Sequence, residues 1–184
     1  MIEAVAVRPG SHSVGPDSGR CRVHTYRDGL AQKAGHDLII EVGHWNASVE
    51  VGDDGTLAAV ALEADPRSLE VLEGHRGVKP LTDSDRTEIR SNIDEKILHG
   101  QPIKFSSSSV EHSDGRLVVR GELTIAGTTR PASFELALDE NGRVSGTLPV
   151  TQSNWGIKPY RAFMGALKVR DAVDIVLDAA LPSG

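Results

Sequence analysis

From about residue 20 onward, apolar and polar residues alternate along the chain with a period of two, the pattern of half-buried β-strands. The clearest case is residues 117–125, in which one face carries the apolar side chains Leu117, Val119, Leu123 and Ile125. Residues 134–139 and 173–179 repeat the alternation, and turn-forming clusters such as Ser113-Asp114-Gly115 separate the runs. Short strands joined in this way predict a mainly β fold of antiparallel hairpins, either a sandwich or a barrel.

Residues 83–99 break this rhythm, because apolar residues recur there at every fourth position. They are Ile89, Ile93 and Ile97, with Leu98 beside them. One apolar stripe of this kind predicts an amphipathic helix inserted in the strand series. Asp83 or Ser84 can cap its first turn, and Gly100 followed by Pro102 can end it. We expect this helix to cover one end or flank of the barrel.

The chain divides into a short leader and one domain. Residues 1–19 are rich in Gly, Ser and Pro and predict a flexible leader, so the β-barrel domain is expected to span residues 20–184. All-β barrels of this length commonly form a single domain. Within the domain, Pro159 to Leu167 has the composition of a second, shorter helix, although Gly165 interrupts it.

Composition and charge exclude several classes of function. Hydrophobic residues make up 39% and charged residues 25% of the chain, which is typical of a folded globular protein. The net charge is −6, and acidic and basic residues are interspersed. We therefore expect neither the cationic surface of a nucleic-acid-binding protein nor electrostatic docking on anionic lipid. No run approaches the ~20 apolar residues of a spanning helix, and the first residues show no signal peptide. A cytoplasmic protein without stable membrane insertion is expected.

Four segments, in order along the chain, match motifs of one family. Residues 102–108 fit P-x-I-x-F-x-S, and residues 121–131 fit G-x-L-T-x-x-G-x-T-K/R-P. Asn154-Trp155-Gly156-Ile157 occupies the place of an Asn/Asp-Phe-Gly motif, and residues 171–175 are similar to a closing G-D-x-V-x-I strand. Together these motifs, which cover roughly residues 20 to 181, resemble the YceI family.

The resemblance implies a lipocalin-like antiparallel β-barrel whose interior accommodates a long-chain isoprenoid lipid, either polyprenyl or quinone-like. It implies carriage or sequestration of that lipid without catalysis and without a cofactor, and a homodimer is compatible with the sequence. The chain departs from the family pattern in residues 92–98, which lack the aromatic residues of a D-F-F-D stretch, and in the richer segment 158–170. Both differences fall near the expected pocket.

Residues 36–44 place two histidines at the ends of an apolar row. Alternate positions share one face, and they are His36, Leu38, Ile40, Val42 and His44. If the three aliphatic residues face the interior, both histidines do so too, roughly 26 Å apart and too far to share a metal. A polar group at a pocket mouth suits a lipid with a solvated head group, and His36 is the stronger candidate for this role. Alternatively, a bulge or strand end exposes the histidines. The remaining histidines lack the spacing of a zinc site, so no metal is expected.

Residues 155–164 concentrate large, adaptable side chains in a chain whose aromatic content is only 4%. They are Trp155, Tyr160, Phe163 and Met164, with the cations Lys158 and Arg161 between them. One interpretation is a lid, in which the apolar groups contact the lipid and a cation meets its head group. The other is a plug, in which Trp155 and Phe163 close one end of the barrel. The plug is favoured for Trp155, and the lid for Tyr160 and Met164.

Inward strand residues complete the predicted site. Phe105 is expected to contact the lipid, and the lining or core is expected to comprise Val119, Leu123, Phe134, Leu136, Ile175 and Leu177. A charge at Leu123 should abolish lipid uptake. Cys21, the only cysteine, is not expected to be reactive, because its neighbouring arginines lie on the opposite strand face.

Two alternative functions stay open. One is an enzyme that uses His36 for proton transfer on a bound isoprenoid or quinone, for which the sequence offers no second catalytic residue. A G-x-S-x-G nucleophile elbow and a phosphate-binding loop are both absent from the sequence. The other is a filled barrel that serves as an interaction module.

Overall fold

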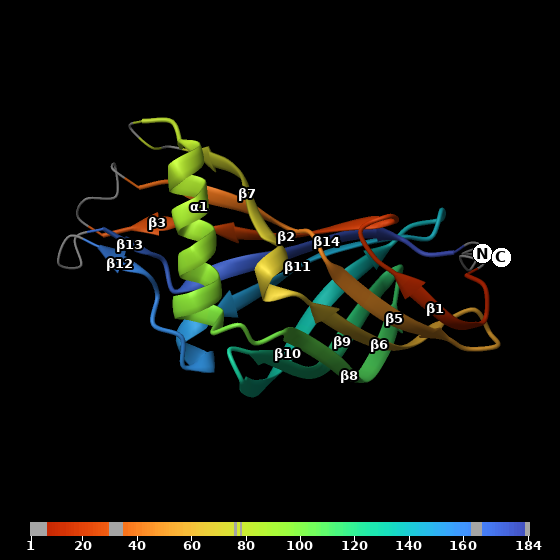
Figure 1. Ribbon diagram of the computed structural model, residues 1–184. Helices are drawn as coiled ribbons and strands as arrows, with labels where there is room; N and C mark the ends of the chain where they lie inside the picture. Colours follow the sequence, from red (N-terminus) through yellow and green to blue (C-terminus); the bar gives the residue numbers. More distant parts are fainter. Residues whose placement is uncertain (1–6, 30–34, 76, 78, 163–166, 183–184) are drawn as a thin grey trace.

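The computed structural model describes residues 7–29, 35–75, 77, 79–162 and 167–182. Its main feature is an antiparallel sheet of 11 strands that curls on itself into a half-barrel (Figure 1). In spatial order the strands are β1 (Gly10–Val14), β5 (Trp45–Val51), β6 (Leu57–Ala64), β8 (Ile103–Ser113), β9 (Arg116–Ile125), β10 (Thr128–Leu138), β11 (Arg143–Thr151), β14 (Ala172–Ala180), β2 (Gly19–Thr25), β4 (Asp37–Val42) and β7 (Leu69–His75). The predicted mainly β, antiparallel fold is confirmed.

Strand alternation sets which side chains face the interior of the curled sheet. Along β9, the side chains predicted to face inward are all buried: Leu117, Val119, Leu123 and Ile125. The strand register places apolar side chains of the neighbouring strands on the same inner face, since Val119 pairs with Val110 on β8 and with Phe134 on β10. The turn between β8 and β9 uses Asp114 and Gly115 at φ 48° and 76°, the left-handed pair that a two-residue hairpin requires. Turn chemistry and period-two burial therefore act together to fix the register.

The predicted helix packs against β7 and the adjoining core. It comprises α1 (Asp83–Asn92) and a π-helical continuation, Ile93–Leu98. The apolar stripe faces the core as expected, with Ile89, Ile93 and Ile97 half-buried and Leu98 fully buried. In Figure 1 the helix stands across the end of the half-barrel from which the short strands β3, β12 and β13 project. Among the described residues, no helix has the length and apolar character needed to cross a bilayer.

The helix begins at Asp83 as the sequence predicts, but its N-cap is the residue before the two predicted candidates. Thr82 is the N-cap, with an extended backbone at φ −87° and ψ 165°. Its hydroxyl accepts a hydrogen bond from the backbone N–H of Asp85 at 3.1 Å, and the Asp85 carboxylate accepts one from the N–H of Thr82 at 2.9 Å. This reciprocal capping box satisfies two backbone donors, which neither Asp83 nor Ser84 achieves from inside the helix.

Part of the predicted flexible leader is an ordered strand. Residues 10–14 form β1, which pairs with β5 from Gly10↔Val51 to Val14↔Ala47. The strand obeys the same alternation as the rest of the sheet, because Val14 is 3% exposed whereas Ser11 and Ser13 face solvent. Glycine and serine therefore signalled an edge strand here rather than a disordered segment, and residues 1–6 lie outside the described residues.

The second helix expected at Pro159 to Leu167 is not formed. Arg161–Ala162 (β12) pairs instead with Leu167–Val169 (β13), and β13 pairs with Arg27–Asp28 (β3) to give a separate three-stranded sheet. The free edge of β3 offers backbone partners that a short helix interrupted by glycine cannot match. Residues 163–166 lie outside the described residues.

Candidate functional site

The interior face of the curled sheet is apolar but incompletely covered. Val23, Ile175 and Leu148 form one register row across β2, β14 and β11, and Leu177 follows on the same face of β14. All four side chains are only half-buried. Val23, Ile175 and Leu177 have register partners on both sides, so their exposure cannot come from a sheet edge, whereas Leu148 lies beyond the last pair of β11 with β10. We call these four residues the inner strip, a place where the interior of the half-barrel stays accessible.

Other inward residues belong to a packed core. Val119, Leu123 and Leu136 are 0%, 2% and 4% exposed, so they are covered by their neighbours. Phe105 is also buried, and its ring meets that of half-buried Phe134 edge-to-face at a centroid distance of 5.1 Å. The predicted lining set therefore splits into two parts. Ile175, Leu177 and Phe134 face accessible space, whereas the rest support them from within the core.

The two histidines of the predicted row flank β4, and only the first of them is half-buried. His36 is half-buried, and its Nε2 lies 2.5 Å from the carbonyl oxygen of Lys79. A side chain at Gly77 would collide with the His36 ring, so the ring is closely packed. Further along the row, Leu38 is half-buried and Ile40 is 2% exposed.

The expectation that His44 also faces inward is wrong. Gly43 and His44 lie in the bend between β4 and β5, and the side chain of His44 is exposed. The bend is held by hydrogen bonds from the Gly43 N–H to the Ser68 carbonyl and from the Asp65 N–H to the His44 carbonyl, both at 2.9 Å. The strand therefore ends before His44, which was the alternative that the sequence left open.

Trp155 is buried, as the plug interpretation requires. It ends the 3₁₀ turn Gln152–Trp155, is 6% exposed, and donates a 2.8 Å hydrogen bond from Nε1 to the carbonyl oxygen of Leu123. Lys158 and Tyr160, expected in the lid, are exposed. Phe163 and Met164 lie outside the described residues, so the lid interpretation stays a prediction.

A pocket of about 240 Å³ lies between the three-stranded sheet and the start of β14. Its lining residues are Asp28, Ser153, Pro159, Arg161, Lys168, Val169 and Asp171. Arg161 pairs with Lys168, and Lys168 pairs with Asp28, so all three project from one face of the small sheet. The sequence analysis identified Arg161 but missed Lys168. Because the segment was expected to be helical, the cross-strand pairing of these two cations could not be predicted.

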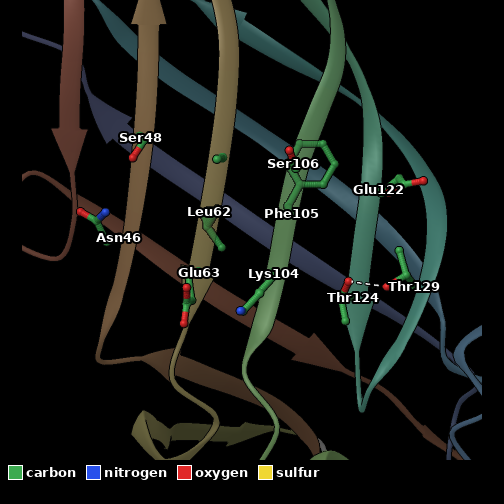
Figure 2. Close-up of a pocket in the computed structure, with 11 residues that line it drawn as sticks. Asn46, Ser48, Leu62, Glu63, Lys104, Phe105, Ser106, Glu122, Thr124 and Thr129 are labelled. Atoms are coloured by element: carbon green, nitrogen blue, oxygen red, sulfur yellow. Dashed lines mark hydrogen bonds between the residues drawn. The ribbon is translucent and has the colours of Figure 1, made fainter.

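The outer face of the sheet carries a groove of about 430 Å³ with different chemistry (Figure 2). Two cross-strand rows form its surface: Ser48, Ala61, Ser106 and Glu122, and beside them Asn46, Glu63, Lys104, Thr124 and Thr129. The hydroxyl groups of Thr124 and Thr129 are hydrogen-bonded at 2.7 Å. Short polar and charged side chains dominate this groove. The apolar surface that a hydrocarbon chain requires lies on the opposite face of the same strands.

Comparison with protein families identifies the chain. A family model described as a YceI-like domain matches residues 40–181, more than half of the sequence. This chain belongs to the YceI-like family. The match runs from β4 to just beyond β14 and so includes most of the curled sheet. A comparison with curated proteins gives no significant match.

Solved structures share the YceI-like fold at low sequence identity. The crystal structure of BcnA from Burkholderia cenocepacia is 17% identical, with a TM-score of 0.62, and the alignment covers 86% of this chain and 94% of BcnA. A mutant CJ YceI protein with a monobromobimane guest is 10% identical, with a TM-score of 0.57, and the alignment covers 79% of this chain and 85% of that protein. These likenesses establish a common architecture.

Cys21 of this YceI-like chain lies on the inner face of β2 and is 4% exposed. Burial, with a smaller contribution from Glu41, raises the pKa of its thiol from 9.0 to about 12. The contribution of the neutral thiol to stability is therefore fully present below pH 9 and is lost as the pH rises from 9 towards the folded-state pKa, because the unfolded state ionises first.

We expect wild type to lose roughly 1 kcal/mol more stability per pH unit between pH 9 and 11 than Cys21→Ala does. Urea unfolding of both proteins at several pH values measures this difference. Parallel pH profiles for the two proteins would show that the thiol ionises as easily in the folded state as in the unfolded state.

Among the described residues, no group of three or more His, Cys, Asp or Glu side chains is placed to hold a metal.

Proposed function

We propose that this chain binds a long isoprenoid lipid, polyprenyl or quinone-like, inside the curled sheet and carries or sequesters it without catalysing a reaction. The observation that carries the proposal is the inner strip, four aliphatic residues in the middle of the sheet that face inward and stay half-exposed. A filled barrel would bury them, so their exposure favours a cavity over an interaction module with a solid interior. The YceI-like family supports the same reading of the interior.

Apolar burial supplies the affinity in this proposal. At about 25 cal/mol per Å², covering 300 Å² of hydrocarbon contributes roughly 7 kcal/mol before the cost of association is subtracted. The contribution is spread along the chain, so no single contact dominates. Longer isoprenoid chains are therefore expected to bind more tightly until the interior is full.

Catalysis through His36 is not favoured by its surroundings. The Nε2 atom of His36 lies against the Lys79 carbonyl, and that contact occupies one of the two ring nitrogens. We retain His36, Leu38 and Ile40 in the proposed site as the wall near its opening. Lys158, Tyr160 and Arg161 stay in the proposal as groups around that opening.

The proposal is tested first by mass spectrometry of the purified protein, under gentle ionisation and again after organic extraction. We expect an apolar species of isoprenoid composition at near-stoichiometric occupancy. A bare protein mass that does not change after incubation with polyprenyl lipids and quinones would contradict the proposal.

A matched pair of variants on β14 locates the site. Ile175→Glu places a carboxylate in the inner strip and is expected to weaken binding of a polyprenyl lipid at least tenfold, because the charge must be desolvated by hydrocarbon. Val176→Glu carries the same charge on the outer face, beside Arg22 and Thr147, and is expected to bind as wild type does. Titration of both variants with the lipid measures the difference. Equal affinities would place the lipid outside the half-barrel.

A further inference from the structure

Trp45 carries a buried donor that has no hydrogen-bond acceptor within the part of the chain that the structure describes. Its side chain is 5% exposed, and Nε1 has no partner. The other tryptophan, Trp155, is buried to a similar degree, but its Nε1 donates to the Leu123 carbonyl. Burying an N–H group without an acceptor is costly and uncommon, and it often marks the position of a water or a ligand.

The other buried polar atoms without a partner do not carry the same signal. Arg86 Nε and Asp94 Oδ1 belong to charged groups that pair through another of their atoms, and Asp178 Oδ1 lies 2.7 Å from Nε of Arg143 in an ion pair. Thr25 Oγ1 belongs to a half-buried hydroxyl group that can rotate. Trp45 alone among them presents a rigid donor on a side chain more than nine-tenths buried.

The indole lies on the inner face of the sheet. Buried and exposed residues alternate strictly along β5, and Trp45 belongs to the buried set. Its register partner is Ala64, and the next inner residue on its own strand is Ala47. Beyond these two small side chains, Leu62 and Ile103 are only half-buried. The neighbours of Trp45 on this face are therefore two alanines and two aliphatic side chains that are incompletely covered.

Trp45 also lies close to the level of the inner strip. Val42 is the last residue of β4 and follows Glu41, which pairs with Arg22 of β2. Continuing that register places Val42 opposite Cys21, and Cys21 pairs with Leu177 of the inner strip. Two residues separate Val42 from Trp45, so their Cα atoms are at most about 11 Å apart. Trp45 therefore lies within about 11 Å of a residue that is level with the inner strip, and it does not line the pocket of Arg161 and Lys168.

We propose that the indole N–H of Trp45 donates a hydrogen bond to an oxygen atom of the bound lipid. This inference rests on the proposed function and adds the orientation and class of the ligand. The oxygen-bearing end lies inside the half-barrel, and the hydrocarbon chain extends along the inner strip. An uncharged indole donor suits a neutral acceptor, so the ligand is an isoprenoid with a carbonyl or hydroxyl oxygen, such as a quinone, and not a pure hydrocarbon.

Two probes of similar apolar character separate the contributions. The first is a ubiquinone with several isoprene units, and the second is squalene, which has no oxygen. Trp45→Phe keeps an aromatic ring and removes the donor. We expect this variant to bind the quinone about tenfold more weakly than wild type and to bind squalene within about twofold of wild type. Trp155→Phe, the matched control, should change both affinities by the same factor.

A measurement on unmodified protein avoids reliance on a variant that folds poorly. The chain has two tryptophans, so the ¹H–¹⁵N spectrum contains two indole signals, which the Phe variants assign. We expect the Trp45 indole proton to move downfield when the quinone binds and not when squalene binds. The Trp155 signal should stay in place, because its acceptor is the Leu123 carbonyl.

The outcomes separate the two proposals. If wild type binds neither probe, the proposed function and this inference both fail. If both probes bind, but Trp45→Phe shows no loss specific to the quinone and the indole signal is unchanged, only the inference fails, and an ordered water satisfies Trp45. If Arg161→Gln, and not Trp45→Phe, selectively weakens binding of the quinone, the oxygen-bearing end lies at the pocket that Arg161 and Lys168 line, and the proposed orientation is wrong.

Discussion

Replacing Val119 with lysine is expected to prevent folding, whereas replacing the adjacent Val118 with lysine is expected to be tolerated. Val119 is 0% exposed and lies between Val110 and Phe134 on the inner face of the sheet. A lysine there must be buried uncharged or pull its neighbours apart, at a cost of about 4 kcal/mol or more. Such a cost is comparable to the whole stability of many domains of this size.

Val118 provides the matched control because it shares the strand but points to the outer face. Its register neighbours are Glu111 and Glu135, so a lysine at position 118 meets two carboxylates in solvent. The expected change in the free energy of unfolding is within about 1 kcal/mol. Soluble yield and urea unfolding of both variants measure the contrast. Similar losses at the two positions would show that the inner and outer faces of β9 are assigned incorrectly.

The same alternation explains how much of the fold the sequence could predict. Leu117 to Ile125 carry a period of two that requires one buried face, and the glycine-containing turn at Asp114-Gly115 can adopt only a few geometries. Both signals are local, and so is the stripe of isoleucines at positions 89, 93 and 97. These elements could therefore be predicted without knowing which other segments they pack against.

The errors arose where pairing with a distant segment decides the local structure. Residues 10–14 became β1 because β5 offers a free edge, and residues 161–162 became β12 because β13 is anchored on β3. Neither pairing leaves a mark in the segment itself, which reads as a leader in one case and as a helix in the other. Sequence separations of this size require the fold as a whole.

For the candidate site, the sequence could predict which residues face the interior of the sheet, but not which of them stay accessible. Periodicity identifies Leu123 and Ile175 equally as inward residues, yet Leu123 is 2% exposed and Ile175 is half-buried. The difference depends on what the opposite wall presents, which no local pattern records. A charge at Leu123 would therefore disrupt the core before it tested lipid uptake, and Ile175 is the better position for that experiment. The unpaired Nε1 of Trp45 is likewise visible only in three dimensions.

One arginine of α1 is hydrogen-bonded to a bulge in β7. β7 carries a bulge where Ile39 and Ile40 of β4 pair with Glu73 and Val71, which leaves Leu72 without a register partner. Nη1 of Arg86 donates hydrogen bonds to the carbonyl oxygens of Val71 and Leu72 at 3.2 and 3.3 Å. The guanidinium group thus satisfies backbone acceptors that the bulge withdraws from the ladder. No residue of α1 itself is fully buried, so apolar packing alone holds the helix weakly.

Arg86→Leu is expected to release the helix locally, because leucine keeps an apolar stem and removes both hydrogen bonds to β7. The loss of charge-assisted bonds to two partly buried carbonyls should cost roughly 2 kcal/mol, which corresponds to about a 30-fold increase in amide exchange across residues 83–98. Hydrogen exchange followed by mass spectrometry measures that rate directly.

Arg90→Leu is the control. Exposed Arg90 donates only one hydrogen bond to a carbonyl, that of Arg67, so this substitution should accelerate exchange by less than about fivefold. The helix covers the end of the half-barrel beside the proposed opening, so faster exchange in Arg86→Leu should be accompanied by faster release of a bound lipid. Unchanged exchange would mean that the isoleucine stripe, and not the bulge contact, holds α1 in place.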